Sequence, residues 1–274
     1  MPIKILFLLL ATAFLLFVMP GGTATASLLG GSASIPSCPP YRLTAPPAGV
    51  GREVIGIDVS ASTRGGELAS LYEAAADGAI DTAEREHLAV LVEAFTDASS
   101  SAHLIYADSF SSSTGSDLLD LASANRVRCQ AYRAVHDLLF QSRTARATGT
   151  DVAGNLAELV ARAREATIAG KPADVLALTD GLTAPAPRHS AGHDLIDLRR
   201  LIHSGERPPA IYRQHRSAFA IGDAKGMDVA IKGIDRQWSG SLASSSDADA
   251  LTQLWTRACK DAHAKSCNVT EEVP

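Results

Sequence analysis

Three short segments of the chain carry oxygen-bearing side chains that could hold a hard metal ion. They are Asp58-Val59-Ser60-Ala61-Ser62-Thr63, Gly149-Thr150-Asp151 and Thr179-Asp180-Gly181. Their donors are hydroxyls and carboxylates, without imidazole or thiolate. Such donors suit Mg²⁺ or Mn²⁺, which favour octahedral oxygen coordination, and they disfavour zinc or copper. These residue types therefore predict a site for one divalent cation.

Apolar segments lead into two of these polar segments. Residues 53–58, Glu-Val-Ile-Gly-Ile-Asp, predict a buried central strand of a parallel sheet, and residues 174–179 predict a second strand that runs into Asp180. Gly149-Thr150-Asp151 precedes a predicted helix over 152–169. In open α/β sheets, ligands bind outside the carboxyl ends of the strands, at a topological switch point. We expect the three polar segments to meet there.

The rest of the chain alternates between segments with helical periodicity and segments with strand patterns. Helical spacing covers 68–76, 82–95, 124–146, 195–202 and 247–262, and further strands are predicted at 102–107, 118–121 and 218–221. Only 5% of the residues are aromatic while 46% are hydrophobic, which favours helices packed on a sheet over a β-sandwich. Strands alternating with long helices imply right-handed βαβ crossovers. The predicted fold class is α/β, with a doubly wound, mostly parallel sheet and helices on both faces.

The three polar segments resemble the metal-ion-dependent adhesion site of von Willebrand factor A (VWA) domains. That site has a D-x-S-x-S pattern after the first strand, a Thr in a G-T-D-like turn and an Asp after a later strand. This chain has VIGIDVSAST, TGTDVAGNL and VLALTDG in the same order. A D-x-S-x-S pattern by itself is weak, because small polar residues are common in turns. The three segments together are more specific, and the resemblance, which covers residues 53–255, implies a Rossmann-like VWA fold.

The resemblance also implies a role for each site residue. Ser60, Ser62 and Thr150 would place hydroxyl oxygens on the metal, while Asp58 and Asp180 would act through bound waters and by orienting the hydroxyls. Neutral ligands leave the positive charge of the ion poorly compensated, so an Asp or Glu carboxylate of a protein partner can take an open coordination position. The expected function is therefore a binding module and not an enzyme.

Two other functional classes share features with the sequence. The segment Ile55-Gly56-Ile57-Asp58 is also typical of Mg²⁺-dependent phosphoryl-transfer enzymes of ribonuclease-H or actin-like fold, although hydroxyls follow it here. A serine hydrolase would need a Ser-His-Asp set, but the sequence has no G-x-S-x-G motif. His189 and His193 lie four residues apart without a nearby third metal ligand. Asp151 is predicted to cap the helix that follows it.

The N-terminus predicts export. An apolar run over residues 5–19 follows Lys4, and Ala24-Thr25-Ala26 is an A-x-A cleavage signal. The alternative is an uncleaved membrane anchor, which requires roughly 20 apolar residues. The expected organisation is a signal peptide or anchor at 1–26, a Pro-, Gly- and Ser-rich linker at 27–51, a VWA-type domain at 52–264 and a tail at 265–274. The predicted location is secreted or extracytoplasmic, with membrane contact only through the N-terminal anchor.

The four cysteines gain meaning from export, because an even count outside the cytosol usually indicates disulfides. Four cysteines allow three pairings. Cys259 and Cys267 are close enough in sequence to join a helix end to the tail, which leaves Cys38 to pair with Cys129. The formal charge of -5, with scattered Lys and Arg, offers no basic surface for a phosphate backbone, so nucleic acid is not expected as a partner.

Overall fold

The core of the fold is a sheet whose central strand is the apolar segment at the start of the predicted domain. We describe the protein from a computed structural model covering residues 38–41, 43, 45, 48–60, 66–95, 103–110, 115–141, 150–183, 196–236, 240 and 243–273. These all belong to one unit that spans residues 36–274. Residues 1–26, predicted as a signal peptide or anchor, lie outside the described residues.

Within the described residues, six strands form a single sheet in the order β3-β2-β1-β4-β5-β6. The strands are β1 (Arg52–Asp58), β2 (Ala89–Phe95), β3 (His103–Ser109), β4 (Ala173–Leu178), β5 (Asp228–Lys232) and β6 (Ser266–Thr270). All neighbouring pairs are parallel except β2 and β3. The chain moves outward from β1 to β3 and then returns to the other side of β1, so the switch point lies between β1 and β4.

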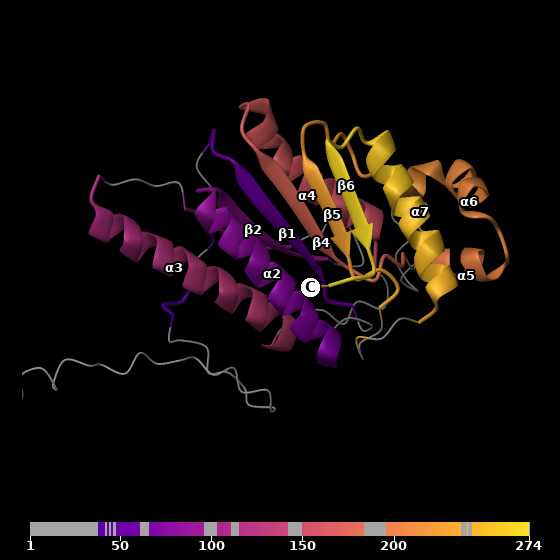
Figure 1. The fold of residues 1–274 in the computed structure, drawn as a ribbon, viewed down its shortest axis with the longest axis horizontal. Coiled ribbons are helices and arrows are strands. Elements are labelled where there is room, and N and C mark those ends of the chain that lie inside the picture. Colours follow the sequence, from indigo (N-terminus) through magenta and orange to yellow (C-terminus); the bar gives the residue numbers. More distant parts are fainter. Residues whose placement is uncertain are drawn as a thin grey trace, which may run out of the picture. The chain divides into compact units, whose positions relative to one another are not determined.

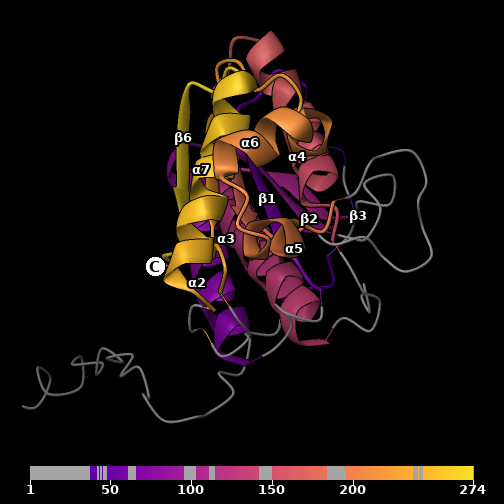
Figure 2. The ribbon, with the colours of Figure 1, turned by 90° about the vertical axis from the view of Figure 1, so that its right-hand side faces the viewer.

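Helices cover the sheet from both sides, as Figures 1 and 2 show. They are α2 (Gly66–Arg85), α3 (Asp117–His136), α4 (Val152–Ile168), α5 (Leu198–His203), α6 (Pro208–Gln214) and α7 (Ser245–Asp261). Two hydrophobic cores result, one between the sheet and the pair α2 and α3, the other on the opposite face under α4 to α7. The predicted fold class, a doubly wound and mostly parallel α/β sheet, is confirmed.

Strand β1 is buried along its whole length. Its side chains alternate, with Ile55 and Ile57 in the core under α2 and Val54 in the core under α4. Gly56 also faces α4, and a Cβ there would overlap the rings and methyls of Phe95 and Leu159. A central strand with helices on both faces therefore reads as an uninterrupted apolar run.

One predicted helix is wrong. The sequence indicated helix over 82–95, but α2 ends at Arg85 and residues 89–95 form β2, all seven of them buried. The apolar residues that suggested a helix are spaced three and four apart by coincidence, in a strand that is apolar on both faces. Short apolar runs cannot be assigned by periodicity alone.

Two predicted strands are also wrong. Residues 118–121 lie in α3, where Leu118, Leu119 and Leu121 are 80%, 59% and 59% exposed. Residues 218–221 overlap a 3-10 turn over Arg216–Phe219, and the fifth strand is instead β5. Strand β6 falls within residues 265–274, which the sequence placed outside the sheet. These two strands are half exposed, so they lack the apolar run used to find the others.

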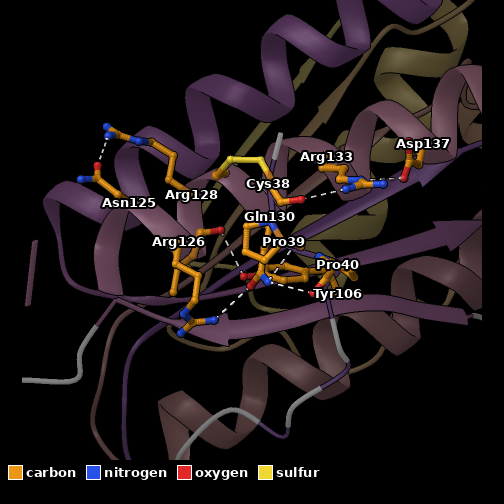
Figure 3. Close-up of a disulfide and its surroundings, with 12 residues drawn as sticks. Cys38, Pro39, Pro40, Tyr106, Asn125, Arg126, Arg128, Gln130, Arg133 and Asp137 are labelled. Carbon is orange, nitrogen blue, oxygen red and sulfur yellow. Dashed lines mark hydrogen bonds and ion pairs between the residues drawn. A yellow bond between two sulfur atoms is a disulfide. The ribbon is translucent and has the colours of Figure 1, made fainter. Parts of the chain in front are cut away.

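Both predicted disulfides are confirmed. The Cys38–Cys129 bond has a Cα–Cα distance of 5.8 Å and joins the extension before β1 to α3 (Figure 3). The guanidinium of Arg133 donates to the Cys38 carbonyl at 2.9 Å, and the Gln130 amide donates to the Pro40 carbonyl at 3.1 Å. The Cys259–Cys267 bond joins the end of α7 to β6. Among the described helices, none combines the length and apolar character needed to span a membrane.

The packing around Gly56 predicts a clear difference between two glycine substitutions. Gly56→Ala should lower the free energy of unfolding by about 1–3 kcal/mol, because its methyl group would displace Phe95 and Leu159 from a packed core. Gly78→Ala, in α2 with no atom within 4 Å of the added Cβ, should raise it by about 0.5–1 kcal/mol. Urea denaturation of both variants measures these changes. Equal effects at the two positions would contradict the packing described for β1.

A row of carboxylates on α2 faces α3. Glu73, Asp77 and Asp81 recur every four residues, so they share one side of the helix. The carboxylate of Glu73 lies 2.8 Å from the His136 ring, and Asp81 accepts a hydrogen bond from the Tyr132 hydroxyl. Asp77 lies between them, and its Oδ1 is buried with no hydrogen-bond partner among the described residues. Burial, followed by the charges of Glu73 and Asp81, raises the pKa of Asp77 to about 7, although His136 lowers it.

This raised pKa makes the stability of the protein depend on pH. Because Asp77 binds its proton more tightly in the folded state, its contribution is fully present below the unfolded pKa and is lost as the pH rises through about 7. Asp77→Asn should therefore be more stable than the wild type at about pH 8, with a smaller difference at about pH 5. Urea denaturation at both pH values tests this. Asp249→Asn, on the exposed side of α7, is the matched control. A difference independent of pH would contradict the assignment.

Candidate metal-binding site at the carboxyl ends of β1 and β4

The predicted site residues follow the two strands that flank the switch point. Asp58 is the last residue of β1, and Thr179 directly follows β4. Because Ile57 is in register with Leu178, the next residue of each strand lies beside the other. The polar segments after both strands therefore meet at one edge of the sheet, as the sequence predicted for a ligand site.

The side chain of Asp58 joins all three polar segments. Its carboxylate is fully buried, and its Oδ1 accepts hydrogen bonds from the Ser60 N–H at 2.9 Å and the Thr150 hydroxyl at 3.4 Å. Its Oδ2 accepts a bond of 2.9 Å from the Thr179 hydroxyl. One carboxylate thus fixes the loop after β1, the residue before α4 and the loop after β4.

Burial and hydrogen bonding act on Asp58 in opposite directions. Desolvation raises the pKa of this carboxyl, and the hydrogen bonds from the backbone and side chain of Ser60, from Thr179 and from Thr150 lower it. Burial prevails, so the pKa lies above the usual value. The hydrogen bonds offset part of the cost of placing a carboxylate inside the protein.

The loop after β4 is held in place by its own hydrogen bonds. The Thr179 hydroxyl accepts from the Gly181 N–H at 3.1 Å while it donates to Asp58, so both capacities are used. The carboxylate of Asp180 accepts a hydrogen bond from the Leu182 N–H at 2.9 Å. The backbone carbonyl of Asp180 accepts one from the Asp235 N–H at 2.8 Å. Asp180 therefore sits in a fixed turn one residue beyond the contact with Asp58.

Helix α4 fixes Thr150. Asp151 caps the helix through a hydrogen bond from the Gly154 N–H to its side chain at 2.9 Å, as the sequence predicted. The Asn155 amide donates to the Asp151 carbonyl at 2.7 Å. The residue before the cap thus has a defined position, and Thr150 is itself buried.

Tyr72 of α2 adds a hydroxyl that the sequence analysis did not include. Its side chain is fully buried, and its hydroxyl has no hydrogen-bond partner within the described residues. Burial raises its pKa well above the usual value, and the charges of Asp180 and Asp58 raise it further, while Arg236 lowers it. A Cβ on Gly233, after β5, would lie 2.6 Å from this hydroxyl. Tyr72 is therefore a buried, unpaired donor close to the two predicted aspartates.

The structure brings most of the predicted set together. Asp58, Ser60 and Thr150 are in direct contact, Asp180 follows in the adjoining turn, and Ser62 lies outside the described residues. The sequence analysis named Thr179 in the third polar segment but gave it no role at the site, where it donates to Asp58. Tyr72 was missed, because it is one polar group in the apolar face of a helix and carries no local signal.

The donor chemistry fits a hard divalent cation. The Thr150 hydroxyl donates its proton to Asp58, so its oxygen lone pairs can accept from, or coordinate, another ligand. The unpaired Tyr72 hydroxyl would suit a polar occupant or its water shell. In the described part of the chain, no group of three or more His, Cys, Asp or Glu side chains could hold a metal. A cation here would depend on hydroxyls and water, which suits Mg²⁺ or Mn²⁺.

Fold and site together define a Rossmann-like α/β protein with an oxygen-rich site at its switch point. No protein-family description matches the chain, and no curated protein matches it. A solved structure of von Willebrand factor type A from Catenulispora acidiphila is similar over 78% of this chain and 42% of its own, with 20% identity and a TM-score of 0.35. The human COPII-coat protein Sec24c is similar over 81% of this chain and 29% of its own, with 12% identity and a TM-score of 0.37.

This chain thus spans less than half the length of either solved protein. Both TM-scores lie below 0.5, so the fold class rests on the strand order and registers and not on these likenesses.

The hydrogen bonds of Thr179 predict a contrast with another buried threonine. Thr179→Val would leave an oxygen of Asp58 and the Gly181 N–H without a partner, at a cost of about 1–3 kcal/mol in unfolding free energy. Thr183→Val removes a buried hydroxyl that has no partner within the described residues, so it should be neutral or stabilising. Thermal or urea denaturation of the two variants decides. A stable Thr179→Val protein would mean that Asp58 does not depend on this hydroxyl.

Proposed function

We propose that the chain is an exported VWA-type binding module, not an enzyme, which holds one Mg²⁺ or Mn²⁺ and uses it to bind a protein partner. The observation that carries this proposal is the convergence of Thr150 and Thr179, from two distant segments, on the buried carboxylate of Asp58, which also accepts a local bond from the Ser60 N–H. Turn residues with purely local roles would bond within their own segments. Here three segments far apart in sequence share one carboxylate at the switch point.

In this proposal some residues contact the metal ion directly, and others orient those ligands. Ser60, Thr150 and, by the resemblance, Ser62 would supply hydroxyl oxygens to the ion. Asp58 accepts hydrogen bonds from the first two and would thereby fix the orientation of their hydroxyls, and Asp180 lies in the adjoining turn. The bound cation would offer an incompletely compensated positive charge to an Asp or Glu carboxylate. The partner class is therefore a protein with an exposed acidic side chain.

The disulfides support the exported location. Both pairs of cysteines are bonded, and such bonds persist mainly in oxidising compartments. The predicted cleavage after Ala26 remains a prediction, which N-terminal sequencing of exported protein would test.

The metal assignment predicts specific losses of cation binding. Calorimetry should show one Mn²⁺ bound by the wild type, while Thr150→Val and Asp58→Asn should each weaken binding by about 10–100-fold, because one removes a ligand and the other its orientation. Thr183→Val is the matched control, since it also removes a buried threonine hydroxyl but one with no proposed part in metal binding. Circular dichroism must show that each variant is folded. Wild-type affinity in both folded site variants would overturn the proposal.

The same preparation can test the carboxylate function. With Nα-acetylglutamate amide as the probe, Mn²⁺ should raise the affinity for the probe by the factor by which the probe raises the affinity for Mn²⁺, because such coupling is reciprocal. The corresponding glutamine derivative should show no coupling. Coupling to both derivatives would argue against a carboxylate as the group that takes the open coordination position of the ion.

A further inference from the structure

The face of the sheet under α2 is only partly covered. Helices α2 and α3 make their main contacts in the sheet with β1 to β4. In Figure 1, strands β5 and β6 lie to the right of these two helices, which do not cover them. The side chains of β5 that point to this face, at positions 228, 230 and 232, are half-buried. A groove of about 570 Å³ lies here, with one wall formed by α2 and its floor by β1, β4, β5 and β6.

Acidic side chains form a row across one end of this groove. The register pairs Glu53 of β1 with Asp174 of β4, and Asp174 with Asp228 of β5. Residues paired in this way lie side by side and point to the same face. All three line the groove, so three carboxyls on adjacent strands face one space.

Within the described part of the chain, only Asp228 of these three carboxyls has a cation as partner. Asp228 accepts bonds from the Lys265 ammonium at 2.6 Å and the Ser266 hydroxyl at 2.5 Å, and these bonds lower its pKa. Glu53 and Asp174 form no ion pair within the described residues. Lys232, on the same face, lines the groove without pairing with either.

Glu53 is the unusual member of the row. The residue is only 5% exposed, it lines the groove, and within the described residues it has no side-chain hydrogen bond. Burial raises its pKa well above the usual value, and the charges of Asp174 and Glu86 raise it further, although Lys232 lowers it. The pKa of Asp174 is raised by burial and then by the charges of Asp228 and Glu86, although Lys265 lowers it. A buried carboxyl directed at open space without a partner costs stability unless a cation reaches it.

Beside these carboxyls, the groove is lined mainly by small and apolar residues. Its α2 wall consists of small residues, among them Ala75, Gly78 and Ala79, and its floor includes Leu176 and Ala230. Such a surface fits a methylene chain. Carboxyls on two separate strands suit the compact ammonium, with its three independent donors, better than the planar fork of a guanidinium, which favours one carboxylate.

We propose that this groove binds an alkylammonium group, carried by a lysine side chain or a free diamine, with the ammonium between Glu53 and Asp174. The methylene chain would lie along the small residues of α2 and Leu176. This site lies at the amino ends of the strands and does not depend on the metal-binding function proposed above.

The test uses two probes that distinguish the sources of the ammonium. They are 1,5-diaminopentane and the peptide acetyl-Ala-Ala-Lys-Ala-Ala-amide, with the same peptide carrying norleucine in place of lysine as the uncharged control. Backbone amide NMR should show shifts along β1, β4 and β5 with the ammonium probes and none with the control. Binding should strengthen from about pH 5 to about pH 8, because both raised-pKa carboxyls must ionise to pair with the cation.

Variants connect the binding to the two carboxyls. Glu53→Gln and Asp174→Asn should each weaken ammonium binding by at least about tenfold. Glu158→Gln, on α4 across the sheet, is the matched control and should bind as the wild type does. Glu53→Gln is expected to fold, since it replaces an unpaired buried acid with a neutral side chain of the same shape.

Each outcome has a defined meaning. Binding of the diamine alone supports the site and assigns a free amine, whereas binding of the lysine peptide assigns a protein partner. The proposal is overturned if neither ammonium probe binds, if the norleucine peptide binds equally well, or if folded Glu53→Gln retains wild-type affinity.

Discussion

A carboxylate buried at the end of the central strand constrains the architecture around it. Removing Asp58 from water costs several kcal/mol unless hydrogen bonds replace its hydration. Those bonds come from Ser60, Thr150 and Thr179, so the loop after β1, the approach to α4 and the loop after β4 must converge. The arrangement of the site therefore follows from the hydrogen bonds that the buried carboxylate of Asp58 requires. Its hydroxyls are oriented before any ligand arrives, which reduces the ordering that binding would require.

The two central strands, β1 and β4, carry polar side chains at both ends. At their carboxyl ends, Asp58 and Thr179 form the candidate metal site, and at their amino ends Glu53 and Asp174 face the groove under α2. Asp58 lies five positions after Glu53, roughly 16 Å along a strand. Burial raises the pKa of Glu53 at one end of β1 and of Asp58 at the other, which makes both carboxyls sensitive to a cation.

The periphery is held by covalent bonds where packing is thinner. Strand β6 is a half-exposed edge strand, and the Cys259–Cys267 bond ties it to α7. The extension before β1 contributes little to the sheet, and Cys38–Cys129 fixes it to α3 together with the hydrogen bonds of Arg133 and Gln130 (Figure 3). Each disulfide therefore reinforces an element that buries little apolar surface of its own.

Local pattern determined much of this protein. The buried strand over 53–58, the helix over 152–169, the cap at Asp151 and the cysteine pairs follow from periodicity, cap chemistry and spacing, which are properties of neighbouring residues. Tertiary structure decided the rest. An apolar run buried on two faces looks the same in helix and strand, so 82–95 was misassigned. Half-exposed β5 and β6 have no such run. The roles of Tyr72 and Glu53 depend on which strands lie beside them, and no local pattern specifies that neighbourhood.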